Sequence, residues 1–109
     1  MCDARLGRNS RYYTGPFERG KREHICTAYL WNCCWGEPGA SPGRIHVKVC
    51  VYPNTQRERV VYDWVSEILN PGDTRRLDIY IKIPEDVDTA ELPLGIKVWC
   101  EGIEAEPSW

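Results

Sequence analysis

Histidines and cysteines stand close together at two places in this sequence, and zinc binds both kinds of side chain. His24 and Cys26 are two residues apart and His46 and Cys50 are four apart, so each pair is expected to share one face of a β-strand. Structural zinc sites typically use Cys-x2-Cys and similar spacings, and the sequence contains no Cys-x2-Cys. We therefore expect two surface histidines, no metal ion and no cofactor.

Cysteine is frequent in this chain, with six in 109 residues. An even number of cysteines in a small β-rich protein is typical of a disulfide framework. Adjacent Cys33 and Cys34 are expected to point to opposite faces of a strand. The disulfide candidates, of which the first three lie within expected strands, are Cys26, Cys50, Cys100, Cys33 and Cys34.

Catalysis would need a nucleophile, a base and a group that orients the base. His24 and His46 are the two histidines, and both are expected on strands. The sequence has no Gly-x-Ser-x-Gly turn, no phosphate-binding glycine loop and no Asp/Glu–His motif. We therefore expect no catalytic residues, and a protein that is not an enzyme.

Arginine and tyrosine are interleaved near the N-terminus, and these side chains can hold phosphates and stack on nucleic-acid bases. The net charge of −2 argues against a large basic footprint, so a solvated arm or an added edge strand is the simpler interpretation. Tryptophans could instead stack on a carbohydrate or lie in an interface: Trp31, Trp35, Trp99 and Trp109. The interaction candidates are Arg5, Arg8, Arg11, Tyr12, Tyr13, Trp99 and Trp109.

The two ends of the chain carry opposite charge. Residues 1–24 hold six basic and three acidic side chains, whereas residues 85–109 hold one basic and seven acidic ones. Opposite charges attract, within one molecule or between neighbours. The distribution favours contact with a protein partner or between copies of the chain, with two solvated ends as the alternative.

Apolar and polar residues alternate in several short segments, which indicates strands with one buried face. Strands are expected at 24–34, 44–52, 57–68 (one strand or two), 76–84 and 95–101, with a short one near 11–14. In the third segment, Val60, Tyr62 and Trp64 are expected to face away from Val61, Asp63 and Val65. The expected core comprises Leu77, Ile79, Ile81, Ile83, Ile45, Val47, Val49, Val98 and Trp64.

These elements predict an all-β protein: a single antiparallel β-sandwich of about seven strands. We expect the sandwich domain at residues 24–101, an N-terminal basic arm at 1–23 and an acidic tail at 102–109. One stretch reads Leu-Asn-Pro-Gly-Asp-Thr at 69–74 and leads into a strand that ends at Pro84. Pro93, Leu94 and Gly95 then open the last strand.

This pattern, over residues 44–101, resembles the C-terminal half of immunoglobulin-like modules in archaeal and bacterial surface proteins. Lys97 stands where those modules usually have tyrosine. The resemblance implies an immunoglobulin-like sandwich with a structural role and no catalytic residues.

The chain shows no apolar segment typical of a secretory signal or a membrane span. Many cysteines without an export signal favour a hyperthermophilic source, archaeal or viral, with the protein inside the host cell or in a virion. We expect a non-enzymatic structural or protein-interaction module of a viral or cell-surface assembly. The alternative is a small nucleic-acid-binding protein that acts through its N-terminal arm.

Overall fold

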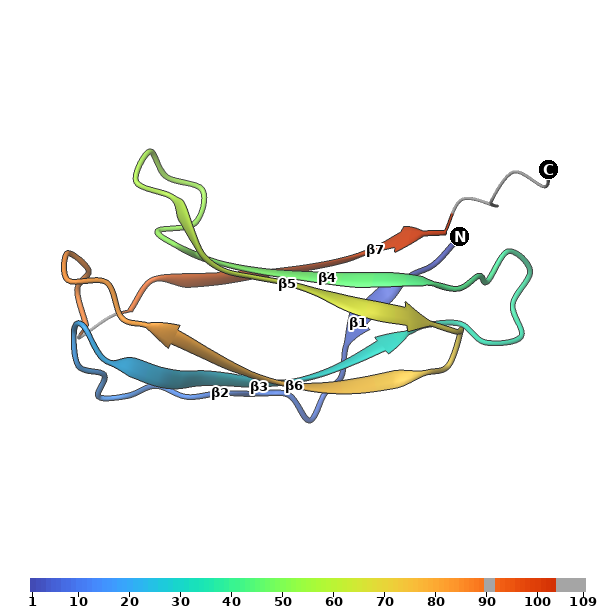
Figure 1. Cartoon of the computed structure of the whole chain (residues 1–109), viewed down its shortest axis with the longest axis horizontal. Coiled ribbons are helices and arrows are strands. Elements are labelled where there is room, and N and C mark those ends of the chain that lie inside the picture. The colour runs from blue at the N-terminus through green and yellow to red at the C-terminus, as the bar shows by residue number, and fades with distance from the viewer. Residues whose placement is uncertain (90–91, 104–109) are drawn as a thin grey trace.

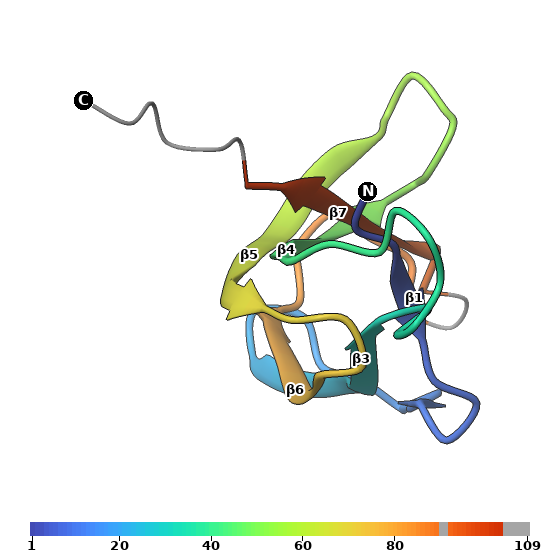
Figure 2. The same ribbon diagram turned by 90° about the vertical axis from the view of Figure 1, so that its right-hand side faces the viewer.

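The structure, a computed structural model, describes residues 1–89 and 92–103. Within these residues seven strands form two antiparallel sheets, which pack face to face as a β-sandwich (Figures 1 and 2). The described residues contain no helix. The fold expected from the alternating pattern is confirmed. No helix in the described part of the chain is long and apolar enough to cross a membrane.

Sheet A is built around β3 (Arg22–Asn32). One side of β3 pairs with β6 (Thr74–Lys82), and the other side is shared by β1 (Ala4–Leu6) and β2 (Arg11–Tyr12). The two short strands both lie within residues 1–23, where the sequence predicted an arm with one short strand. Two short parts of this segment therefore add an edge to sheet A.

Sheet B is built around β4 (Gly43–Val51), which lies between β5 (Arg59–Leu69) and β7 (Leu94–Gly102). The third expected segment forms one long strand, β5, and not two short ones. Among the described strands β5 and β7 each have a hydrogen-bonded neighbour on one side only, so both are edge strands of sheet B.

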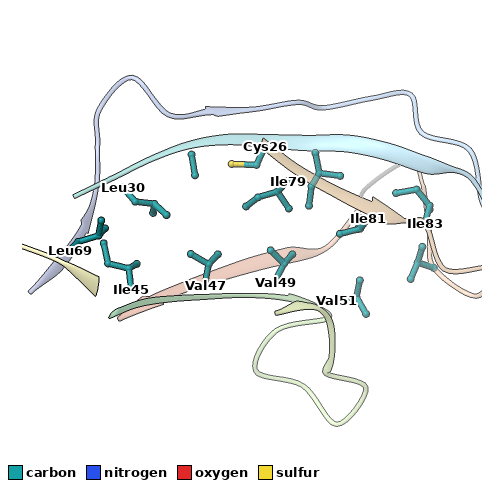
Figure 3. Close-up of a cluster of buried hydrophobic side chains, with 13 residues drawn as sticks. Cys26, Leu30, Ile45, Val47, Val49, Val51, Leu69, Ile79, Ile81 and Ile83 are labelled. Carbon is teal, nitrogen blue, oxygen red and sulfur yellow. The ribbon is translucent and has the colours of Figure 1, made fainter. Parts of the chain in front are cut away.

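The core fills the space between the sheets (Figure 3). The expected core residues of β4 and of residues 79–83 are buried, and Leu77, Trp64 and Val98 are partly buried and pack against them. The predicted core is therefore confirmed. Fully burying one such aliphatic side chain stabilises a protein by about 1.5–3 kcal/mol, so this layer is what holds the two sheets together.

Asn32 is a buried polar residue at the end of β3 that ties three other segments together. Its Nδ2 donates to the carbonyl oxygens of Ser41 at 2.9 Å and Leu69 at 3.0 Å. Its Oδ1 accepts a hydrogen bond from the backbone amide of Asp3 at 3.3 Å. An unpaired amide in this position would be costly, and these bonds remove that cost.

Two disulfides are present. One joins Cys2, just before β1, to Cys100 on β7, and so links sheet A to sheet B. Figure 2 shows the N-terminus of the chain close to β7. Gly43 lies against this bridge: a Cβ there would lie 2.8 Å from Cys100 Sγ and closer still to Cys2 Sγ, so no larger residue fits. The other disulfide joins the adjacent residues Cys33 and Cys34.

Candidate functional site

The disulfide pattern corrects the sequence-based expectation at two positions. Cys26 and Cys50 are buried free thiols, whereas Cys100 pairs with Cys2, which the sequence did not single out. Cys26 lies among the aliphatic side chains of the core, and this burial raises the pKa of its thiol to about 11. A thiol with that pKa is protonated at neutral pH and is a poor nucleophile.

Cys33 and Cys34 were expected to point to opposite faces of a strand, and this expectation was wrong. β3 ends at Asn32, so strand alternation no longer applies to the two cysteines. Within residues 1–89 and 92–103, the group with metal-ligand geometry is Asp3, Cys33 and Cys34. Both of its sulfurs are held in the disulfide, so they are not thiolate ligands in this state.

His24 and Cys26 lie on opposite faces of sheet A, against the expectation that they share one. A register shift in the β3–β6 ladder between these two residues turns Cys26 into the core. His24 lies on the outer face, where its ring is 4.6 Å from that of Tyr13 and 4.5 Å from that of Tyr80. His24 is therefore stacked on Tyr80, with the ring of Tyr13 tilted by 42° on its other side, and it shares no metal site with the Cys26 thiol.

Thr27 is nearly buried beside this stack and connects it to β6. Its hydroxyl donates a hydrogen bond to Asp78 Oδ1 at 3.0 Å, and its Oγ1 lies 3.1 Å from His24 Nε2. The Thr27 hydrogen bond, followed by the charge of Arg76, lowers the pKa of Asp78. The ionised carboxylate of Asp78 accepts the hydrogen bond from the Thr27 hydroxyl, and this bond links β3 to β6 on the outer face of sheet A.

Cationic side chains surround the aromatic rings on the outer face of sheet A. We call this surface the basic-aromatic face: its rings are Tyr13, His24, Tyr29, Trp31 and Tyr80, and its cations are Arg5, Arg8, Arg11, Arg22, Arg76 and Lys82. Strand pairing sets these groups side by side, with Arg5 opposite Trp31 on β1 and β3, and Tyr29 opposite Arg76 on β3 and β6. Side chains from four strands thus converge on one surface.

Two hollows indent the basic-aromatic face beside the β1–β2 loop. One has a volume of 550 Å³ and the other 710 Å³, and both are lined in part by Arg8, Asn9 and Tyr29. The loop is fixed to β3 by both backbone groups of Tyr29: its amide donates to Ser10 Oγ at 3.0 Å, and its carbonyl accepts from the Gly7 amide at 2.6 Å. The hollows therefore have one wall set by the backbone.

The arginines of the basic-aromatic face differ in how they are neutralised. Arg5 forms an ion pair with Asp3 at 3.0 Å, and Arg76 lies 3.4 Å from Asp78. Arg8 and Arg11 are exposed and form no ion pair with any residue that the structure describes. These two guanidinium groups are available to an anion from solution.

The remaining interaction candidates lie elsewhere. Tyr12 pairs with Cys26 and so lies on the core side of sheet A, where it lines a hollow of 530 Å³ with Tyr13, Phe17 and Leu94. Trp99 lies on the outer face of sheet B, where its ring stacks on His46 at 5.0 Å. Trp109 lies outside the described residues.

The outer face of sheet B carries a row of exposed apolar residues on β5, which we call the β5 row: Val60, Val65 and Ile68. Their partners on β4 are Cys50, His46 and Arg44, which alternate with the core-facing residues of β4. All three members of the row therefore point outward. Apolar side chains at an open strand edge are typical of contact surfaces.

No protein-family model, curated protein or solved structure matches this chain. The geometry of the two outer faces is therefore the basis for the function that follows.

Proposed function

We propose that this chain is a non-enzymatic interaction module that self-associates through the β5 edge of sheet B. The observation that carries the proposal is a symmetry in β5: the outward-facing residues Val60, Asp63, Val65 and Ile68 are arranged symmetrically about Trp64. A strand with this pattern is complementary to a second copy of itself in antiparallel orientation.

The symmetry arises from two register shifts in the β4–β5 ladder. Val49 and Cys50 on β4 pair with Tyr62 and Val60, so Val61 is an extra residue on β5. A second shift, beyond Val65, adds another extra residue near Ser66. Each bulge moves the next apolar side chain to the outer face, which a strict alternation would have pointed inward.

Natural edge strands are commonly guarded by charges that keep other strands away. On β5 two of these charges are occupied within the molecule: Arg59 is paired with Asp86, and Glu67 is paired with Arg75. Asp63 is the exposed charge of β5 for which no such ion pair is seen in the described residues. The edge is therefore weakly guarded for a strand of 11 residues.

Antiparallel pairing of two β5 strands across a two-fold axis at Trp64 would set Val60 opposite Ile68. Asp63 would lie opposite Val65 of the second copy, so two aspartates would not face each other directly. Such an interface uses the same patch on both copies and extends sheet B into a continuous sheet of two molecules.

The proposal also covers the type of sandwich and the kind of assembly in which the chain takes part. We assign the sandwich to the immunoglobulin-like type found in surface modules, on the turn at residues 69–74 and the order of the strands in the two sheets. Two disulfides and an edge suited to self-pairing fit a structural part of a thermophilic viral or cell-surface assembly.

Sedimentation velocity over a wide range of protein concentrations tests the proposal. The intact chain should show a mass that rises toward a dimer. Val65→Asp with Ile68→Asp should remain monomeric, because the carboxylate introduced at position 65 would lie opposite Asp63 of the second copy and like charges directly across a strand pair destabilise it. Ile103→Asp is the matched control, since Ile103, Val65 and Ile68 are each 46% exposed and Ile103 lies outside β5. Asp63→Thr should strengthen association.

Two results would contradict self-association through β5. One is an intact protein that stays monomeric at every concentration. The other is a double-aspartate variant, at positions 65 and 68, with the same mass distribution as the intact protein.

A further inference from the structure

The basic-aromatic face is a second surface, on the opposite sheet from the β5 row, and the argument for it does not depend on self-association. We propose that this face binds single-stranded nucleic acid, with bases on the rings of β3 and phosphates on the arginines beside them. The proposed site includes side chains of β3 and β6 as well as the N-terminal segment.

Charge is the first observation. The face carries six cationic side chains against two carboxylates, Asp3 and Asp78, although the whole chain has a net charge of −2. Both carboxylates are bonded to residues of the face itself, one to Arg5 and the other to Thr27 and Arg76. The uncompensated charge of Arg8 and Arg11 is what a polyanion would neutralise.

Exposed aromatic rings are the second observation. Trp31, Tyr13 and Tyr80 are 42%, 43% and 42% exposed, so part of each residue is open to solvent. The ring of Tyr80 is also in contact with His24 and Arg22, whereas no ring or cation lies against Trp31 among the described residues. Tyr29 lies between them on β3, half-buried, with the Arg76 guanidinium 5.9 Å from the centre of its ring. Rings on a flat sheet beside cations are a platform on which unpaired bases can stack in succession.

The spacing of these groups suits a single-stranded nucleic acid that runs along β3. From His24 to Trp31, β3 is about 23 Å long at about 3.3 Å per residue. Arg5, Arg8 and Arg11 border one side of this track, and Arg76 and Lys82 on β6 border the other. A backbone of phosphates could therefore follow either border while its bases cover the rings.

The rings decide between single-stranded nucleic acid and other anionic partners. A duplex has its bases stacked and paired, so it would offer phosphates to the arginines and leave the rings unused. An acidic protein would also neutralise the arginines, but it would not account for the row of aromatic rings along β3. Arginine beside exposed rings matches a ligand that carries both phosphates and free base faces.

Fluorescence anisotropy with a labelled oligothymidylate and a labelled oligouridylate of about 12 nucleotides tests this binding. Both should bind the intact chain saturably at about 50 mM salt and weaken about tenfold or more by about 200 mM. Arg8→Ala with Arg11→Ala should reduce the magnitude of the negative slope of log affinity against log salt by about 1.4, because two phosphate contacts are lost. Trp31→Ala should weaken binding about tenfold.

The other sheet supplies matched controls. Lys48→Ala with Lys97→Ala removes the same charge from the outer face of sheet B, and Trp99→Ala removes the same ring. These variants should bind like the intact protein, with folding checked for all by near-ultraviolet circular dichroism. Two competing ligands test the ligand class: a duplex of equal length, and polyglutamate. Each should bind at least tenfold more weakly than the single-stranded oligonucleotides.

Four results would overturn the proposal. The first is no binding to either oligonucleotide at about 50 mM salt. The second is Trp31→Ala binding as tightly as the intact protein, which would make the face a simple polyanion site. The third is equal losses in the sheet B controls. The fourth is polyglutamate binding as tightly as the oligonucleotides, which would point to an acidic protein partner.

Discussion

The outer faces of the two sheets differ in where their characteristic side chains come from. On sheet A, cations and rings converge from β1, β2, β3 and β6 onto a central strand. On sheet B, the exposed apolar residues gather on a single edge strand, β5. A surface assembled from several strands can present groups at fixed mutual positions, whereas an edge offers backbone groups and one row of side chains.

The two faces also differ in how they are fixed. On sheet A, side-chain contacts run across the surface itself, from Tyr13 through His24 to Tyr80 and from Thr27 to Asp78. On sheet B, the edge is fixed from below, at a bulge where the buried Ser66 hydroxyl accepts a hydrogen bond from the Ile45 amide at 2.8 Å. We infer that a change on one face leaves the other face intact.

Removing the bridge between the sheets should have the largest effect on stability. Cys2→Ser with Cys100→Ser should lower the free energy of unfolding by about 4–5 kcal/mol, because the bridge closes a loop of nearly the whole chain. Urea unfolding would measure the loss. Below the unfolding transition, oligonucleotide affinity and sedimentation should match those of the intact protein; a parallel loss of either would show that the faces depend on this link.

Substitution of one serine in each sheet compares how much a side-chain hydrogen bond stabilises the β5 bulge of sheet B and the β1–β2 loop of sheet A. Ser66→Ala should cost about 2 kcal/mol, since it leaves the buried Ile45 amide without its acceptor. Ser10→Ala removes the acceptor of the Tyr29 amide at the half-buried edge of sheet A, where water can replace it, and should cost about 1 kcal/mol. Chemical unfolding of both variants gives the comparison. Equal costs would mean that the bulge in β5 is no more rigid than the β1–β2 loop.

The smallest expected effect is a dependence on acid. The pKa of Asp78 is lowered in the folded protein, chiefly by the Thr27 hydrogen bond, so its stabilising contribution is present above the unfolded pKa of about 3.9 and is lost as pH falls through the folded value. The stability difference between the intact protein and Asp78→Asn should therefore shrink between about pH 6 and pH 3. A difference that stays constant over this range would show that the carboxylate does not brace sheet A.

The fold was predictable because long strands display their period. Ile79, Ile81 and Ile83 alternate with polar residues, and that pattern is independent of which strand lies beside them. β1 and β2, at three and two residues, are too short to show any period, so their segment looked like an arm. Cys2 lies beside Cys100 because β1 begins just after Cys2. Since the sequence did not predict β1, it did not predict this disulfide either.

The bulges account for most of what the sequence could not indicate. Strict alternation placed Val60 on the opposite face from Val65, and the extra residue at Val61 puts them on the same face. The register shift after His24 similarly separates its side chain from that of Cys26. A bulge depends on the pairing strand, and one sequence read alone does not reveal its partner.

The basic-aromatic face was visible in part. Arg5, Arg8, Arg11 and Tyr13 were named from the interleaving of arginine and tyrosine near the N-terminus, because they are close together in the chain. Tyr29 and Arg76 are far apart in the sequence and meet only through the pairing of β3 with β6. A sequence search for outward positions on both strands would have found them once that pairing was known.

The Cys2–Cys100 bridge has a consequence for the covalent topology of the molecule. It turns residues 2 to 100 into a closed ring, so a single cut of the backbone within that ring releases no fragment. A protease acting in the exposed loop near Gly36 and Gly39 would create new chain ends while β3 and β6 remain in one molecule. The cut protein would be a circular permutant joined through sulfur, and it would separate into two pieces only after reduction.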